Sequence, residues 1–129
     1  MNKLFNIKVA QKKPEKPMPF LDFSINYNRK LNCSMFTAIK PIFIKYNINE
    51  RVYVRIKGQF YCYATIIKKE IKTLQEIIES GIFLVDVGLR KHDFLELIKK
   101  EYSNKKWWKE EQTEFNVYFL EKYVQMELF

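Results

Sequence analysis

The chain has 129 residues, 47% apolar and 16% aromatic, which is enough to form one domain with its own hydrophobic core. Only 3 Gly and 4 Pro are present, which excludes collagen-like and low-complexity proteins, and the net charge of +8 favours acidic partners. No run of about 18 apolar residues occurs, which excludes a membrane-spanning helix.

The few cysteines and the single histidine limit the chemistry further. Cys33 and Cys62 are too few for a disulfide framework or a four-cysteine zinc site, and His92 alone excludes His-rich metal sites. Gly-rich phosphate loops and HExxH motifs are absent from the sequence. We therefore expect no cofactor and no metal. The N-terminal residues lack the apolar centre of a secretion signal, so we expect a cytoplasmic protein with no membrane partner.

The basic residues are concentrated in the first part of the chain. Residues 1–72 carry 15 basic and 4 acidic side chains, whereas residues 73–129 carry 8 basic and 11 acidic ones. This asymmetry predicts a basic face that binds a polyanion such as nucleic acid. The alternative is a Lys-rich composition without such a partner, since 19 of the 23 basic residues are Lys.

The first predicted elements are an arm and two strands. Residues 1–19 are expected to form an N-terminal arm and an extended linker, because three prolines fall within residues 12–19. Residues 20–27 predict a strand. Residues 35–44 predict a second strand, which Pro41 limits to an edge or a bend of the sheet.

A β-hairpin gives the clearest local pattern. On its first strand, apolar residues alternate with Arg51, Tyr53, Arg55 and Lys57. Gly58-Gln59 predicts the turn, and the return strand is expected to place Tyr61 and Tyr63 beside these cations, with Phe60 on the opposite face. Rings beside cations are typical of surfaces that stack bases and hold phosphates. A face that is simply solvated is the alternative.

The rest of the chain is predicted to be helical before a closing strand. Thr73 and Glu76 form a capping-box pattern for a short helix that Gly81 ends. Residues 90–102 predict a helix with one apolar stripe, and residues 114–124 predict the last strand. The order indicates an α+β fold: a mostly antiparallel sheet or small β-barrel with two or three helices.

Three segments carry a resemblance to a known family: residues 29–41, 46–68 and 88–102. They contain a basic turn, a Thr-containing strand that ends in Lys, a hairpin and a helix that ends in Tyr. This succession resembles the ASCH family of the PUA-like superfamily over residues 20–122. The resemblance implies a small PUA-like barrel over residues 20–124 with a cleft for RNA or a modified nucleotide.

Some ASCH proteins are amidohydrolases that act on acylated cytidine with a Lys, a Thr and a Glu. The resemblance implies Lys30, Thr37 and Asp86 as the corresponding catalytic candidates. Thr37 and Asp86 each lie one position from the family's residue, and a one-residue shift turns a strand side chain to the other face. We therefore favour binding over catalysis and keep an amidohydrolase of modified nucleosides as the alternative.

For binding of RNA or a nucleotide, the expected contacts lie around the cleft and on the hairpin, with Tyr53 stacking on a base and the basic residues holding phosphates. They are Arg29, Lys30, Thr37, Lys40, Arg51, Tyr53, Arg55 and Lys57.

The last five residues, QMELF, resemble the pentapeptide with which bacterial proteins bind the DNA sliding clamp. Leu128 and Phe129 would fill an apolar pocket, and Gln125 would make a polar contact. Residues 125–129 therefore predict a C-terminal tail that binds a clamp, as in a phage or mobile-element adaptor or inhibitor of a host protein. The alternative is a strand end that folds back onto the core.

Overall fold

The structure, a computed structural model, describes residues 18–24 and 27–123, without the side chains of Tyr27, Asn28, Val85 and Tyr123. In this part of the chain five strands form one sheet in the order β1-β3-β4-β5-β2. They are β1 (Phe20–Phe23), β2 (Met35–Pro41), β3 (Arg51–Ile56), β4 (Gln59–Thr73) and β5 (Glu114–Tyr123). β1 runs parallel to β3, and the other neighbouring strands are antiparallel.

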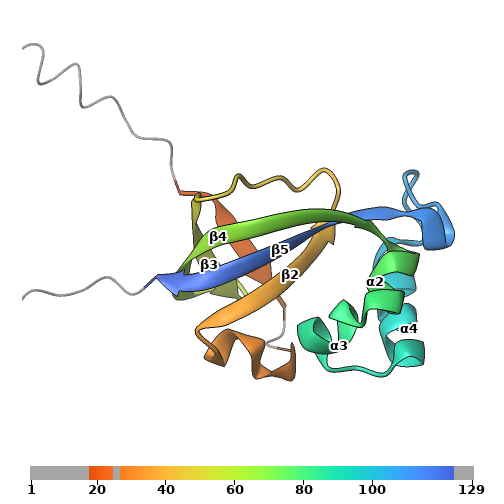
Figure 1. Ribbon diagram of the computed structural model, residues 1–129, viewed down its shortest axis with the longest axis horizontal. Coiled ribbons are helices and arrows are strands. Elements are labelled where there is room, and N and C mark those ends of the chain that lie inside the picture. Colours follow the sequence, from red (N-terminus) through yellow and green to blue (C-terminus); the bar gives the residue numbers. More distant parts are fainter. Residues whose placement is uncertain (1–17, 25–26, 124–129) are drawn as a thin grey trace, which may run out of the picture.

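The described helices follow the long strand β4. They are α2 (Leu74–Ser80), α3 (Ile82–Val87) and α4 (Lys91–Tyr102), with short 3-10 turns η1 (Tyr27–Asn32) and η2 (Glu110–Gln112). Figure 1 shows the sheet curled into a half-barrel, with the three α-helices gathered at one end of it. The expected α+β barrel-like fold is confirmed. None of these helices is long and apolar enough to cross a membrane.

Local chemistry explains where the helices begin and end. The Thr73 hydroxyl accepts a hydrogen bond from the Glu76 amide at 3.2 Å, and the Thr73 amide donates to the Glu76 carboxylate at 2.8 Å. This is the predicted capping box. Gly81 and Gly88 end α2 and α3 with φ angles of 77° and 66°, a backbone region that glycine adopts without strain. Helix α3 is an addition to the two helices that the sequence pattern places.

The structure has two hydrophobic cores, one on each face of the strands β2 and β5. The first fills the curled sheet with Leu21, Leu31, Phe36, Ala38, Tyr46, Val52, Val54, Ala64, Ile66, Tyr118 and Leu120. The second lies between the sheet and the helices and comprises Leu74, Ile77, Phe83, Val87, Phe94, Ile98, Phe115 and Val117. Alternation along a strand therefore sends neighbours such as Val117 and Tyr118 into different cores.

Two predicted strands end earlier than expected. β1 stops at Phe23 instead of residue 27, because its parallel partner β3 ends at Ile56, which pairs with Phe23. β2 stops at Pro41, whose ring nitrogen has no hydrogen to donate. As predicted, β2 lies at an edge of the sheet.

The hairpin prediction is correct in its strands and wrong in two details, the position of the turn and the faces of Phe60 and Tyr61. The turn is at Lys57 and Gly58, which have φ angles of 52° and 81°, and Gln59 already belongs to β4. The register shifts between Val54 and Arg55, so Phe60 pairs with Arg55. This bulge brings Phe60 to the face of Tyr53 and turns Tyr61 away, where its hydroxyl donates to Asn32 at 2.9 Å.

Candidate ligand-binding cavity

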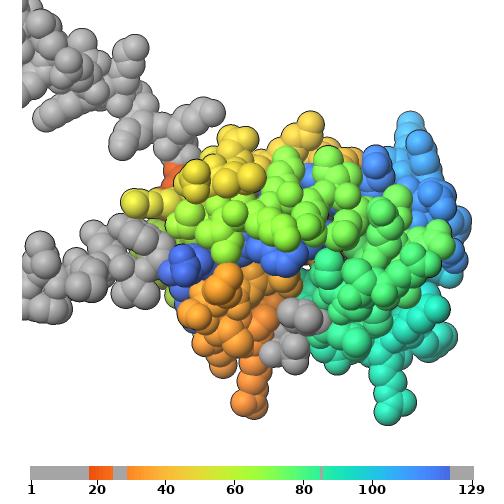
Figure 2. Space-filling model, viewed as in Figure 1, coloured from red at the N-terminus to blue at the C-terminus, as the bar shows by residue number. Residues whose placement is uncertain are grey.

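A cavity of about 470 Å³ lies between the end of the curled sheet and the helices. Its walls come from β1, η1 and β2 on one side and from α3 and α4 on the other. Figure 2 shows these two parts of the surface below the ridge of β4 and β5. The lining side chains that carry a formal charge are Asp22, Lys30, Lys40, Arg55, Asp86 and Glu101.

Three polar side chains meet at the inner wall of this cavity. The Lys30 ammonium donates to Asp86 Oδ1 at 2.7 Å, and the Thr37 hydroxyl donates to the same oxygen at 2.8 Å. Lys30 and Thr37 are each 6% exposed, and Asp86 is 5% exposed. We call Lys30, Thr37 and Asp86 the polar triad. Lys30 and Asp86 line the cavity, whereas Thr37 lies behind them.

Each member of the triad is fixed by apolar neighbours in its own element. Leu31 is buried in the first core and anchors η1, which carries Lys30. Phe36 and Ala38 also enter the first core, so the alternation of β2 turns Thr37 toward the helices. Val87 packs in the second core and places Asp86 at the end of α3. The triad therefore joins three elements from distant parts of the sequence.

Because the triad is buried, two opposing effects act on the pKa of Lys30. Burial lowers the pKa of Lys30, while the charge and the hydrogen bond of Asp86 oppose this change. A buried charge pair of this kind is strongly destabilising to break, because the remaining partner stays desolvated and unpaired. Among the described residues, both hydrogen bonds to the Asp86 carboxylate reach Oδ1. Asp86 is also one of the residues that line the cavity.

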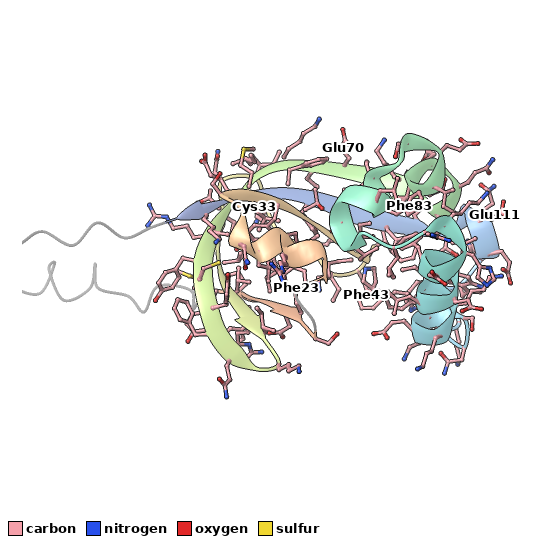
Figure 3. The ribbon with its side chains drawn as sticks, turned by 90° about the horizontal axis from the view of Figure 1, so that it is seen from below. Phe23, Cys33, Phe43, Glu70, Phe83 and Glu111 are labelled. Atoms are coloured by element: carbon pink, nitrogen blue, oxygen red, sulfur yellow. The ribbon has the colours of Figure 1, made fainter. Side chains whose placement is uncertain are left out.

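Lys40 reaches the same cavity from the end of β2. Its ammonium donates to the backbone carbonyl of Asp22 at 2.6 Å. The Phe23 ring centroid lies 4.7 Å from Lys40 Nζ and 4.6 Å from Lys30 Nζ, so one aromatic ring contacts both amines. Figure 3 shows Phe23 beside η1, between the sheet and the helices. Burial lowers the pKa of Lys40, and the charge of Lys30 lowers it further.

Arg55 and Asp22 form the rim of the cavity. The guanidinium donates two hydrogen bonds to the Asp22 carboxylate, at 2.6 and 2.9 Å, and lies 3.8 Å from the centroid of the Phe20 ring. The hydrogen bond from Arg55 lowers the pKa of Asp22, so this carboxylate stays ionised at neutral pH. Arg55 is therefore held in place by its partner before any ligand binds.

The structure brings only some of the predicted contacts together. Lys30, Lys40 and Arg55 line the cavity, and Thr37 supports it. Arg29 is exposed on η1, outside the residues that line the cavity.

The hairpin residues Arg51 and Lys57 are exposed and do not line the cavity. Tyr53 packs in an aromatic cluster on the hairpin face, with ring centroids 5.3 Å from Phe20, 4.6 Å from Phe60 and 5.8 Å from Tyr63.

Several cavity residues were not predicted as site residues. Phe94, Leu97, Ile98 and Tyr102 were expected only as the apolar stripe of a helix, yet they form the apolar wall of the cavity. Burial raises the pKa of Tyr102 to about 12, so its phenol stays protonated. Phe23 and Glu101 had no distinguishing sequence pattern, because their role depends on how β1 and α4 pack.

Two further sequence predictions concern the C-terminal tail and a metal ion. Gln125, Leu128 and Phe129 lie outside the described residues, so clamp binding remains a prediction. Within residues 18–24 and 27–123, no group of three or more His, Cys, Asp and Glu side chains is arranged to hold a metal ion.

Comparisons with known proteins add evidence on the fold. No protein-family model matches the sequence, and no curated protein matches it. The structure is similar to the crystal structure of protein EF3133 from Enterococcus faecalis V583, of the family DUF984, with a TM-score of 0.62. The two chains share 13% sequence identity, and the match covers 99% of this chain and 97% of the other. A likeness at this identity establishes the fold alone.

Proposed function

We propose that this protein binds a nucleoside or nucleotide with a modified base in the cavity between the sheet and the helices. The observation that carries the proposal is the polar triad at the inner wall of a cavity that has further charged side chains around it and an apolar wall from α4. About 300–1,000 Å³ is the usual range for small-molecule sites, which combine apolar walls with a few well-placed polar groups. The volume of about 470 Å³ falls within that range.

The groups in the cavity are complementary to a nucleobase. Aromatic side chains such as Phe23 and Tyr102 offer surfaces against which a planar base packs. The Lys30 ammonium is a donor, and the second oxygen of Asp86 is an acceptor, so together they match a base edge that carries both a carbonyl and an amino group. Lys40 supplies a cation for a phosphate. The resemblance to ASCH proteins supports the same ligand class.

Calorimetric titration with cytidine, N4-acetylcytidine and cytidine monophosphate tests the proposal. We expect at least one of them to bind, and Asp86→Asn to weaken binding about tenfold or more, since a hydrogen bond to a charged group contributes about 1.5–3 kcal/mol. Asp93→Asn makes the same chemical change at an exposed position of α4 and should bind as the wild type does.

Two outcomes of these titrations would exclude the proposal. If none of the three compounds binds at millimolar concentration, or if folded Asp86→Asn binds them as tightly as the wild type, the cavity is not a nucleoside site. Fluorescence anisotropy with single-stranded RNA, duplex RNA and duplex DNA across salt concentrations then tests whether a polynucleotide binds elsewhere on the surface.

The second candidate function is hydrolysis of an acylated nucleoside. The observation in its favour is that the three residues implied by the ASCH resemblance are in direct contact, although 49 and 56 residues separate Asp86 from Thr37 and Lys30. In this proposal, Lys30 and Asp86 move the protons as water attacks the amide carbon and the amine departs. Thr37 is a positioning residue, because its hydroxyl contacts Asp86 and does not line the cavity.

Incubation with N4-acetylcytidine, followed by chromatography for cytidine and acetate, tests hydrolysis separately from binding. We expect Lys30→Met to abolish turnover and Thr37→Ser, which retains the hydroxyl, to preserve it. Turnover that survives in Lys30→Met would remove the triad from the chemistry. Binding without turnover in the wild type would leave the binding function alone.

A further inference from the structure

Lys40 differs from Lys30 in how its charge is balanced. Lys30 forms an ion pair of 2.7 Å with Asp86, whereas no ion pair within 4.0 Å is formed by Lys40 in the described part of the chain. The hydrogen bond from Lys40 to a backbone carbonyl satisfies one of its protons without supplying a negative charge. Lys40 is thus an amine in a cavity, close to a second amine, and no carboxylate of residues 18–24 and 27–123 forms an ion pair with it.

The surroundings of Lys40 favour its neutral form. Burial and the charge of Lys30 lower its pKa, and the more distant carboxylates of Asp86, Asp22 and Glu101 only partly oppose this effect. The Phe23 ring also favours the charged form, although a cation–π contact is a modest interaction. A desolvated lysine beside another cation is the arrangement that activates an amine as a nucleophile.

We propose that Lys40 is a nucleophilic amine that forms an imine with a small aldehyde or ketone in the cavity. The nitrogen lone pair attacks the carbonyl carbon, and the carbonyl π electrons move to oxygen. The carbinolamine then loses this oxygen as water, which carries away both amine hydrogens of the neutral lysine. The balance is one amine and one carbonyl compound giving one imine and one water, so no oxidant or further reactant is needed.

This activity uses the same cavity as the proposed function but a different form of Lys40, because the neutral amine is the nucleophile whereas the protonated amine would hold a phosphate. The cavity is large enough for a small carbonyl compound, and Phe94, Leu97 and Ile98 give it one apolar wall. Lys30 keeps its ammonium engaged with Asp86. It therefore acts on Lys40 through its charge rather than as a competing nucleophile.

Reductive trapping on the full chain tests the proposal. The protein is incubated with pyridoxal at neutral pH and treated with sodium borohydride, and peptide mass spectrometry then measures the labelling of each lysine. We expect Lys40 to be labelled at least about threefold faster than the exposed Lys57, because a lower pKa leaves more free amine at neutral pH. Lys40→Arg retains the cation and should lose the fast-labelled site.

A second measurement separates reactivity from simple access. Competitive labelling with trace acetic anhydride across alkaline pH reports the titration of each lysine, and Lys40 should titrate at a lower pH than Lys57. If Lys40 is labelled no faster than Lys57, titrates at the same pH or above it, or is protected from both reagents, the proposal is wrong. Normal thermal unfolding of Lys40→Arg shows that its loss of labelling is local.

Discussion

The cavity and the hairpin face contain similar kinds of side chains but place them in different surroundings. In the cavity, lysines and aromatic rings are packed between the sheet and the helices, and Lys30 forms an ion pair with the buried Asp86. On the hairpin face, Tyr53 and Phe60 pack against one another at the surface, and Arg51 is exposed on the same strand as Tyr53. The sequence predicted contacts both around the cleft and on the hairpin.

The difference shows that burial, rather than composition, decides what a group of charges and rings can do. Water screens an exposed cation and weakens its attraction for a single ligand. A desolvated polar group instead needs a partner, and that requirement makes a cavity selective. If this comparison is correct, substitutions in the cavity and on the hairpin should differ in both stability and binding.

The largest difference in stability between the cavity and the surface is expected when a charged side chain loses its partner. Asp86→Ala leaves the Lys30 ammonium buried without a carboxylate and should lower the free energy of unfolding by about 3–5 kcal/mol. Glu70→Ala removes the surface contacts of 3.2 and 3.8 Å with Lys68 and Lys72 and should cost about 0–1 kcal/mol. Urea unfolding measures both.

A double variant controls for the interpretation of this first prediction. Lys30→Met combined with Asp86→Leu removes both charges and should recover much of the stability that Asp86→Ala loses. If Asp86→Ala lowers the free energy of unfolding no more than Glu70→Ala does, the ion pair between Lys30 on η1 and Asp86 on α3 does not stabilise the fold.

Aromatic substitutions sharpen the same comparison. Phe94 is 1% exposed and stacks on Phe83 at 5.1 Å, so Phe94→Ala should cost about 3–5 kcal/mol. Phe60 is 47% exposed, and Phe60→Ala should cost about 1 kcal/mol despite its contact with Tyr53. Thermal unfolding should give the same ranking. Equal losses would show that the hairpin cluster is a core in its own right.

Local patterns predicted most of the elements because they depend on neighbours in the sequence. The capping box at Thr73, the stop at Gly81 and the alternation of β3 were all predicted and are present. The bulge that moves Phe60 and the early end of β1 were not predicted, because both depend on the partner strand. Helix α3 has only six residues, too few for a helical periodicity to be recognised.

The sequence suggested some residues of the candidate site but not their arrangement. The ASCH resemblance suggested Lys30, Thr37 and Asp86, but the expected register placed Thr37 on the other face of its strand. In the structure the Thr37 hydroxyl reaches Asp86. The apolar wall of the cavity could not be recognised, since a stripe on α4 has the same pattern whether it faces a core or a cavity.

A smaller loss of stability is expected when one hydrogen bond of the triad is removed and the ion pair between Lys30 and Asp86 is kept. Thr37→Val deletes the hydroxyl that donates to Asp86 Oδ1 and should cost about 1.5–3 kcal/mol in urea unfolding, because the acceptor is charged. Thr37→Ser keeps the hydroxyl and should retain more stability. A valine variant that is as stable as the wild type would show that Lys30 alone satisfies the carboxylate.

The dependence of stability on pH separates Lys40 from the exposed lysines. Its pKa in the folded protein lies below the ordinary value of 10.5, so between these two pKa values the unfolded chain binds more protons. Stability contributed by Lys40 therefore rises with pH through this window and levels off above about 10.5.

We expect the wild type to gain stability relative to Lys40→Met as the pH rises from neutral toward this value. Tyr46 and Tyr102, whose pKa values burial raises to about 12, act in the opposite direction in both proteins. If the difference in free energy of unfolding between the wild type and Lys40→Met does not change with pH, the pKa of Lys40 is not lowered by folding.

The smallest effect on stability is expected on the hairpin, where binding gives the sharper test. Arg51 is exposed, so Arg51→Ala should change the free energy of unfolding by about 0.5 kcal/mol or less. If the hairpin face holds RNA phosphates, this variant should bind RNA more weakly and reduce the slope of log K against log salt by about 0.7–1. If only the cavity binds, the slope stays unchanged while nucleoside binding still depends on Asp86. The two surfaces can therefore be assigned separately, because one variant alters the response to salt and the other alters the affinity for a single base.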